Sequence, residues 1–378
     1  MEYINPNEYG NLLFNKKEEN AVKSVLKERN IFRYSSNKLS KVDKFENKLK
    51  KIININYSLG VVNGISGLIA ALVACGVKEN DRVLVSSYTF LATSLAVKTL
   101  GAIPIPINID LNYGFDIVDL EKELKKGCKA AIVVQLQGRC YNLTKIKKII
   151  KKYNAYLIED SCQAFGAKNK EKYAGTIGDI GVYSFQQFKQ LSCGEGGAIV
   201  TNNKNLYIKM RNYVDMGSER DLYPNWNGKT TLFGQNYRMN NISGAILCVQ
   251  LDKLEYIITK QKKSRKYILD NCNNKKIVKS VYENGDTAMN ILLLLDSKKQ
   301  LEQVKKLGKV YKVEVRSMWN GLYFENNLFK KNKLTDIDLK DYSCKMTKEI
   351  VDRLAVISIP PILTKKDCKI IIKFLNEI

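Results

Sequence analysis

The chain has 378 residues, and hydrophobic residues make up 45% of it, which is enough to build a large core and one or two domains. It contains no histidine, so Ser-His-Asp hydrolases, Cys-His proteases and His-ligated metal centres are excluded. Its nine cysteines include no Cys-x-x-Cys pair, so neither a disulfide framework nor a metal site is expected.

The formal net charge of +24 would suit a nucleic-acid partner. In residues 145–152, however, isoleucines recur at helical spacing and lysines occupy the other positions, as on a solvated amphipathic helix. We therefore expect no nucleic-acid partner. The polar start of the chain lacks the layout of a signal peptide, and apolar runs stay short of the ~20 residues of a membrane span. A cytoplasmic protein without membrane insertion is expected.

Apolar segments alternate with helical ones between about residues 55 and 205. A glycine-containing loop at 63–67 lies between a strand and an apolar helix, and short strands are predicted at 82–85, 102–107, 130–134, 155–158 and 180–185. Nearly continuous apolar strands separated by helices indicate an α/β fold with a largely parallel sheet covered on both faces.

The pattern changes after about residue 245. A long helix is predicted over 243–265, followed by a smaller segment with a strand at 291–295 and a final helix that begins near Thr364. We expect a large domain over 1–245, including an N-terminal helical segment, and a small C-terminal domain over 246–378.

Three polar residues fall at the ends of predicted strands. Asp160 follows the strand at 155–158, and Lys189 comes five residues after Ser184, near the end of the strand at 180–185. Ligands of open α/β sheets bind at the carboxyl ends of the strands. An acid at such a place is often a helix N-cap, but capping does not explain the lysine. A lysine can hold an aldehyde cofactor as a Schiff base while an acid keeps the ring nitrogen protonated, so the sequence predicts pyridoxal 5'-phosphate.

These motifs together resemble the DegT/DnrJ/EryC1/StrS family of pyridoxal-phosphate-dependent sugar aminotransferases. The resemblance extends from Phe32-Arg33-Tyr34 to the segment 358–364 and includes Ser-Phe-Gln-x-x-Lys followed by Gly-Glu-Gly-Gly. It implies the aspartate-aminotransferase fold (fold type I), with a mainly parallel seven-stranded sheet, a smaller α+β domain and a homodimer that shares its active sites. It also implies that glutamate or glutamine donates an amino group to a nucleotide-linked keto-sugar or to a keto-cyclitol. The pathway would be surface-glycan or secondary-metabolite biosynthesis.

The resemblance also implies roles for individual residues. Lys189 would hold the cofactor and then act as the base, and Asp160 would pair with the ring nitrogen. Gln163 would lie over the cofactor's hydroxyl or ring, and Phe90 would stack on the opposite face.

The cofactor's phosphate is expected at the glycine-containing loop. A helix N-terminus favours an anion, so Gly64 and the N–H groups of Ile65 and Ser66 would hold the phosphate together with the Ser184 hydroxyl. The family further implies that Asn236 reaches the phosphate in the neighbouring subunit.

Some positions depart from the family pattern. Ile65 replaces the usual threonine, Gln135 and Gln137 occupy a region where relatives often carry histidine, and residues 316–321 lack the usual Pro- and His-rich segment. Arg238 and Arg316 are candidate anion binders. These departures leave the identity of the acceptor open.

Two alternatives can be weighed against an aminotransferase. Dehydratases of this family have histidine in place of the lysine, and this chain has Lys189 and no histidine. A catalytically silent regulatory or scaffold protein with the same fold is the second alternative. The intact set of Asp160, Gln163, Ser184 and Lys189 argues against it.

Overall fold

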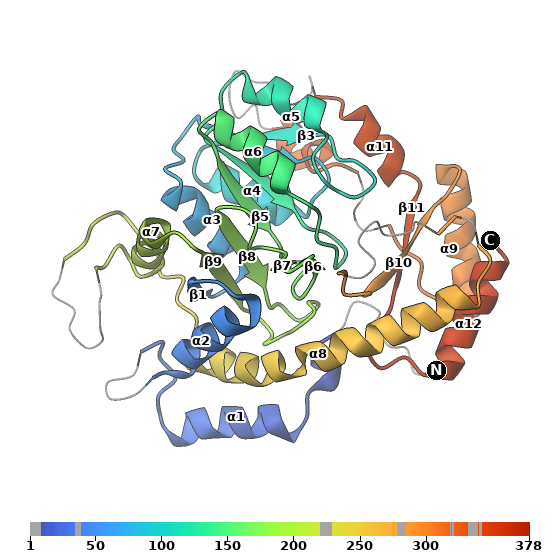
Figure 1. Ribbon diagram of the computed structural model, residues 1–378, viewed down its shortest axis with the longest axis horizontal. Coiled ribbons are helices and arrows are strands. Elements are labelled where there is room, and N and C mark those ends of the chain that lie inside the picture. The colour runs from blue at the N-terminus through green and yellow to red at the C-terminus, as the bar shows by residue number, and fades with distance from the viewer. Residues whose placement is uncertain are drawn as a thin grey trace.

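The computed structural model describes residues 9–34, 39–219, 229–274, 276–277, 285–317, 319, 321–331, 339 and 342–378. Its centre is a seven-stranded sheet in the order β1-β9-β8-β5-β4-β2-β3 (Figure 1). The strands are β1 (Tyr57–Val61), β2 (Arg82–Ser86), β3 (Ile103–Ile107), β4 (Ala130–Val134), β5 (Tyr156–Asp160), β8 (Ile180–Ser184) and β9 (Gly197–Thr201). The expected α/β fold with a mostly parallel seven-stranded sheet is confirmed.

The strand directions place the ends of β5 and β8 at one edge of the sheet. The neighbouring pairs from β8 through β5, β4 and β2 to β3 are all parallel. Only β9 runs against its neighbours β8 and β1. The five strands predicted from apolar runs are the five that pair in parallel, and the strand expected before the glycine-containing loop is β1, whereas β9 was not predicted.

Helices cover both faces of the sheet (Figure 1). They are α1 (Lys16–Lys27), α2 (Lys41–Ile53), α3 (Gly64–Ala74), α4 (Leu91–Thr99), α5 (Ile117–Leu124), α6 (Thr144–Lys152), α7 (Lys204–Val214) and α8 (Asn241–Asp270). A two-stranded hairpin, β6 (Lys168–Asn169) with β7 (Lys172–Tyr173), follows β5.

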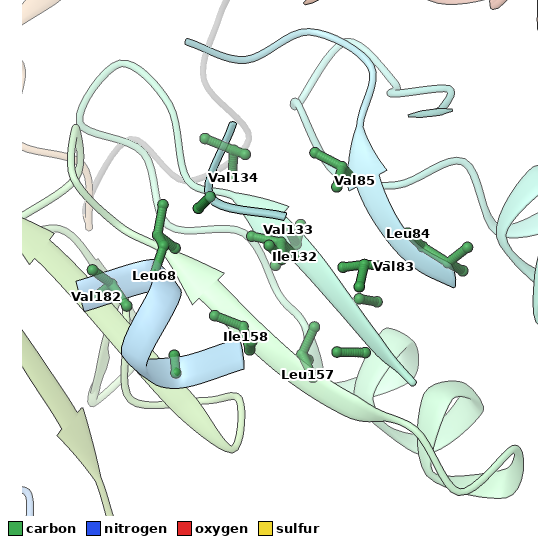
Figure 2. Close-up of a cluster of buried hydrophobic side chains, with 14 of the residues drawn as sticks. Leu68, Val83, Leu84, Val85, Ile132, Val133, Val134, Leu157, Ile158 and Val182 are labelled. Atoms are coloured by element: carbon green, nitrogen blue, oxygen red, sulfur yellow. The ribbon is translucent and has the colours of Figure 1, made fainter. Parts of the chain in front are cut away.

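The core is built from alternating side chains of the strands. In β8, Val182 belongs to the cluster that includes Leu68 of α3, whereas its neighbour Tyr183 packs with residues of α2 and α8. Figure 2 shows Leu68 and Val182 beside Ile158 and the apolar residues of β4 and β2. Successive residues of a strand point to opposite faces, so one sheet holds two apolar layers.

The C-terminal part forms a smaller α+β unit at the far end of α8 (Figure 1). It contains β10 (Asn290–Leu294) paired antiparallel with β11 (Leu354–Ser358), together with α9 (Lys298–Tyr311) and α12 (Lys365–Asn376). The helices α10 (Asn327–Lys331) and α11 (Lys345–Val351) lie between α9 and β11 in sequence, but their Phe329 and Val351 pack in the core of the large sheet. Residues of β10, β11, α9 and α12 form a separate apolar cluster. The predicted boundary at residue 245 falls inside α8, and the division into two domains stays a prediction.

The lysine-rich segment at 145–152 is the helix α6. Its Ile146, Ile149 and Ile150 are buried, while Lys145 and Lys148 are exposed. These lysines have the solvated position that the spacing predicted. Across the described residues, none of the helices combines the length and apolar character that crossing a bilayer requires.

Candidate active site

A cavity of about 610 Å³ lies at the carboxyl ends of β5 and β8, against the first turns of α3 and α4. Met289, Asn290, Arg316 and Trp319 line it from the C-terminal unit. Seven of the residues predicted from the sequence line it: Gly64, Ile65, Phe90, Asp160, Gln163, Ser184 and Lys189. Parallel strands bring their carboxyl ends together, which explains why residues far apart in sequence meet here.

Asp160 is the last residue of β5 and is buried. Its Oδ2 accepts a hydrogen bond of 2.7 Å from the Thr93 hydroxyl, and its Oδ1 accepts one of 3.2 Å from the backbone N–H of Cys162. Both carboxylate oxygens are therefore fixed by donors. Thr93 stands in the first turn of α4, and no sequence pattern indicated that it would reach Asp160.

Lys189 lies in the turn that follows β8. Its N–H donates to the carbonyl of Gln186 at 2.9 Å, and its own carbonyl accepts from the N–H of Gly10 at 3.5 Å. The turn is closed by a bond of 2.9 Å from the Cys193 N–H to the Phe185 carbonyl. These bonds fix the lysine backbone while its side chain lines the cavity.

The start of α3 presses against the end of β8. A Cβ added at Gly64 would meet Cys162 Sγ at 2.9 Å and Ser184 Cβ at 3.2 Å, so a glycine keeps this corner open. The N–H of Ser66 donates to Asn63 Oδ1 at 2.9 Å, and Ser66 is not among the cavity-lining residues. The phosphate contact predicted for Ser66 would therefore require Asn63 to give way.

Aromatic side chains form one wall of the cavity. Phe90 caps α4 and is 56% exposed, so its ring is available to a bound group. Trp319 lies next to it, with ring centroids 6.3 Å apart, and also contacts Tyr88 at 4.8 Å. The sequence assigned no role to Trp319, although it stands in the segment that departs from the family pattern. Residues 318 and 320 of that segment lie outside the described residues.

Asn236 does not line this cavity. It forms an isolated bridge with Asp215, and the nearby Arg238 pairs with the carboxylate of Asp215. Arg238 is thus occupied by a structural ion pair, whereas Arg316, the other candidate anion binder, lines the cavity. The role predicted for Asn236 concerns a second subunit and stays a prediction.

The cysteines near the site are poor nucleophiles. Burial raises the pKa of the Cys162 thiol well above its ordinary value, and burial raises that of Cys193 to about 12. All nine cysteines are free thiols. In the described part of the chain, His, Cys, Asp and Glu side chains form no group that could hold a metal ion.

The donor set fits pyridoxal 5'-phosphate. Lys189 offers an amine, Asp160 a fixed carboxylate and Phe90 an exposed ring, all on one cavity. The start of α3 offers a helix N-terminus beside the Ser184 hydroxyl, in a corner that a Cβ at Gly64 would fill. A phosphate suits such a corner.

Comparison with known proteins agrees with this geometry. Residues 14–376 match the DegT/DnrJ/EryC1/StrS aminotransferase family. The GDP-perosamine synthase of Escherichia coli O157:H7 is 35% identical over 241 residues, which is 63% of this chain and 65% of that protein. The dTDP-3-amino-3,6-dideoxy-alpha-D-galactopyranose transaminase of Aneurinibacillus thermoaerophilus is 34% identical over 236 residues, 62% of this chain and 63% of that protein. Each match therefore spans slightly less than two thirds of the relative.

Solved structures share the fold along nearly the whole chain. An aminotransferase from Psychrobacter cryohalolentis superposes with a TM-score of 0.82 at 24% identity and covers 96% of both chains. The structure of 3-amino-5-hydroxybenzoic acid (AHBA) synthase superposes with a TM-score of 0.85 at 20% identity, again over 96% of both chains.

Proposed function

The chain belongs to the DegT/DnrJ/EryC1/StrS aminotransferase family, and on that premise we propose that it is a pyridoxal-phosphate-dependent aminotransferase. Glutamate or glutamine donates the amino group. The acceptor is a nucleotide-linked keto-sugar or a keto-cyclitol, in surface-glycan or secondary-metabolite biosynthesis. The observation that carries the proposal is the meeting of Lys189 and Asp160 in one cavity with the start of α3. The nucleotide-sugar names of the two curated relatives support the acceptor class.

Each group in the cavity has a defined task. Bound pyridoxal phosphate supplies a ring that withdraws electrons from the substrate carbon and stores the amino group between two half-reactions. With the cofactor bound, the Nζ of Lys189 would hold it covalently and, when free, would carry the proton to or from the substrate carbon. Asp160, held by Thr93, would pair with the ring nitrogen through its fixed carboxylate. Phe90 and Gln163 would lie on opposite faces of the ring.

The phosphate is held at the start of α3. The N–H of Ile65 and the Ser184 hydroxyl are the proposed donors, and Gly64 leaves the space that a phosphate oxygen needs. The N–H of Ser66 contributes only if Asn63 releases it.

Lysine at position 189 favours amino transfer over the other activities considered. A dehydratase of this family would need histidine there, and the chain contains none. A silent scaffold would have no need for a carboxylate fixed by two donors beside a lysine.

We further propose a cytoplasmic homodimer with shared active sites and the two-domain division near residue 245. Phe233 is fully exposed and stands three residues before Asn236, which does not line the cavity of its own chain. A second subunit that covers Phe233 would also bring its own cavity close to Asn236.

The direct test is the visible absorption spectrum of the purified protein with added pyridoxal phosphate, beside Lys189→Ala, before and after L-glutamate or L-glutamine. We expect a yellow band that needs Lys189 and bleaches with a donor. A wild-type protein without such a band would refute the proposed chemistry and favour the scaffold alternative.

A further inference from the structure

A second cavity lies in the C-terminal unit. Its volume is about 810 Å³, and it is bounded by α9, by the segment that follows α9, by the end of β11 and by α12. These elements stand at one end of α8 (Figure 1). The volume falls in the range of about 300–1,000 Å³ that is typical of small-molecule sites. None of the residues assigned to the aminotransferase site lines it.

The wall beside α9 depends on a glycine. The helix is capped by Lys312, whose φ of 55° is left-handed, and the N–H of Val313 then donates to the Gly308 carbonyl at 2.8 Å. A Cβ added at Gly308 would lie 2.5 Å from the Val313 carbonyl oxygen and 2.8 Å from Val315 Cγ2. Glycine at this position therefore lets residues 313–315 fold back against the helix, which gives the cavity a packed wall.

The deeper lining of the cavity is apolar. Its branched aliphatic side chains come from three segments of the C-terminal unit: Val313, Val315, Ile357, Leu363, Ile370 and Ile371. Four of them belong to the apolar cluster of this unit, and Leu363 and Ile370 pack against that cluster. An apolar group that entered the cavity would be removed from water against these side chains.

The outer lining of the cavity carries lysines. Lys306, Lys309 and Lys312 are exposed, and Lys305 is partly exposed. Lys305, Lys309 and Lys312 are spaced four and three residues apart, so they follow one face of α9 and its C-cap. Several cations thus stand in a row beside an apolar surface.

Three carboxylates also line the cavity, and two of them are engaged. Glu302 pairs with Lys305 at 2.9 Å, and Oδ2 of Asp367 accepts from the N–H and the hydroxyl of Thr364 at 2.9 and 2.6 Å. The third carboxylate is Glu314. Across the described residues, no carboxylate lies at ion-pair distance from the lysines at 306, 309 and 312. These three charges are available to an anion.

Ser358 lies between this cavity and the active site. It lines the second cavity, and its Oγ accepts a hydrogen bond of 2.7 Å from Nη2 of Arg316, which lines the cavity that contains Lys189. The end of β11 therefore separates the two cavities. A ligand in the second cavity would lie near the active site without entering it.

We propose that the second cavity binds a nucleoside diphosphate. The aliphatic lining would cover the base, and the lysines would hold the two phosphate groups. A sugar phosphate has no apolar face and a fatty acid has only one charge, so neither uses both features of the cavity. The inference goes beyond the proposed function, because it places a nucleotide outside the active-site cavity. The same chemistry has two sources, a free nucleoside diphosphate and the nucleotide end of a nucleotide-linked sugar.

Calorimetric titration of the purified protein with UDP and GDP tests the proposal. We expect at least one of them to bind, and inorganic pyrophosphate to bind about tenfold more weakly or not at all, since it has no base to bury. UDP-glucose distinguishes the sources: affinity equal to that of UDP would assign both, and weaker binding would assign the free nucleotide. Absence of binding by both nucleotides, or pyrophosphate that binds as tightly as they do, would overturn the proposal.

Two changes locate the site. Ile370→Trp fills the cavity and keeps every lysine, which matters because lysines in a last helical turn also interact favourably with the helix dipole. The double variant Lys309→Gln and Lys312→Gln removes two charges. Each change should weaken nucleotide binding by about tenfold or more. The matched control, Lys148→Gln with Lys151→Gln, removes the same charge at the same spacing from the exposed face of α6 and should bind as wild type does.

The active-site cavity provides the last control. Trp319 lines that cavity and not the second one. Binding that is weakened in Trp319→Ala and unchanged in a folded Ile370→Trp protein would assign the nucleotide to the acceptor site and contradict the proposal. Thermal unfolding establishes that each variant is folded. The titration needs no bound pyridoxal phosphate, so it gives an answer even if the band that depends on Lys189 is absent.

Discussion

The hydroxyl of Thr93 donates a hydrogen bond of 2.7 Å to Oδ2 of Asp160, across 67 residues of sequence. The bond joins the first turn of α4 to the end of β5. Thr93 Oγ1 also lies 2.8 Å from the hydroxyl of Thr89, which extends the network. A carboxylate fixed in this way can meet a cofactor ring nitrogen without first losing side-chain freedom.

Thr93→Val should weaken cofactor retention by about tenfold, because one hydrogen bond to a charged acceptor is lost while the shape is kept. Thr93→Ser keeps the hydroxyl and is the matched control, expected within about threefold of wild type. Equilibrium titration of the absorption band with pyridoxal phosphate measures both. Equal affinities for the valine variant and wild type would mean that Thr93 does not position Asp160.

Gly64→Ala should lower cofactor affinity by about tenfold or more with little effect on folding. The new Cβ would lie 2.9 Å from Cys162 Sγ and 3.2 Å from Ser184 Cβ, in the corner proposed for the phosphate. Gly114→Ala is the control, since its nearest contact, Asp110 Oδ1, is 3.7 Å away. The titration described above and thermal unfolding separate binding from stability. A Gly64→Ala protein with normal affinity would place the phosphate elsewhere.

Glu123→Gln should destabilise the protein by about 2 kcal/mol at pH 7, because Arg82 and Lys126 lose their buried partner. Burial acts to raise the pKa of Glu123, but hydrogen bonds from Lys126 and Arg82 outweigh it and hold that pKa below its ordinary value of 4.5. The stabilisation that ionised Glu123 contributes to the folded state is therefore present above pH 4.5, and it is lost as the pH falls through the lowered pKa.

Denaturant unfolding of wild type and Glu123→Gln, followed at several pH values from 7 downward, measures this contribution. The difference between the two proteins should shrink only at the acidic end. A difference that stays constant throughout would show that the ion pair contributes little and that the effect of the mutation comes from packing.

A mixture of Lys189→Ala and Asn236→Ala subunits tests the shared active site. If Asn236 serves the partner's cofactor, a mixed dimer contains one site with both changes and one unchanged site. Refolding or co-expressing the two variants should then restore part of the activity that each lacks alone. Activity that never exceeds that of the separate variants, in a protein shown to be dimeric, would contradict the role of Asn236.

The sequence alone predicted those helices and strands that are specified by patterns of neighbouring residues. The buried parallel strands appear as apolar runs such as Ala130–Val134, and Thr364 caps α12 because its side chain accepts from the Asp367 N–H. The strand β9 was not predicted, because its pairing with β1 joins residues about 140 positions apart in sequence, such as Leu59 with Ile199. Local residue patterns do not contain that information.

The same distinction applies to the site. The sequence by itself determined the chemical groups: Lys189, Asp160 and Ser184 stand near strand ends, and without histidine any acid-base work falls to Lys, Asp, Glu, Tyr or Cys. Only the tertiary structure decided that Thr93 fixes Asp160 and that Arg316 lines the cavity. The amino-acid sequence decides which chemical groups the protein has, whereas the fold decides the distances between them. Hydrogen bonds and ion pairs depend on those distances.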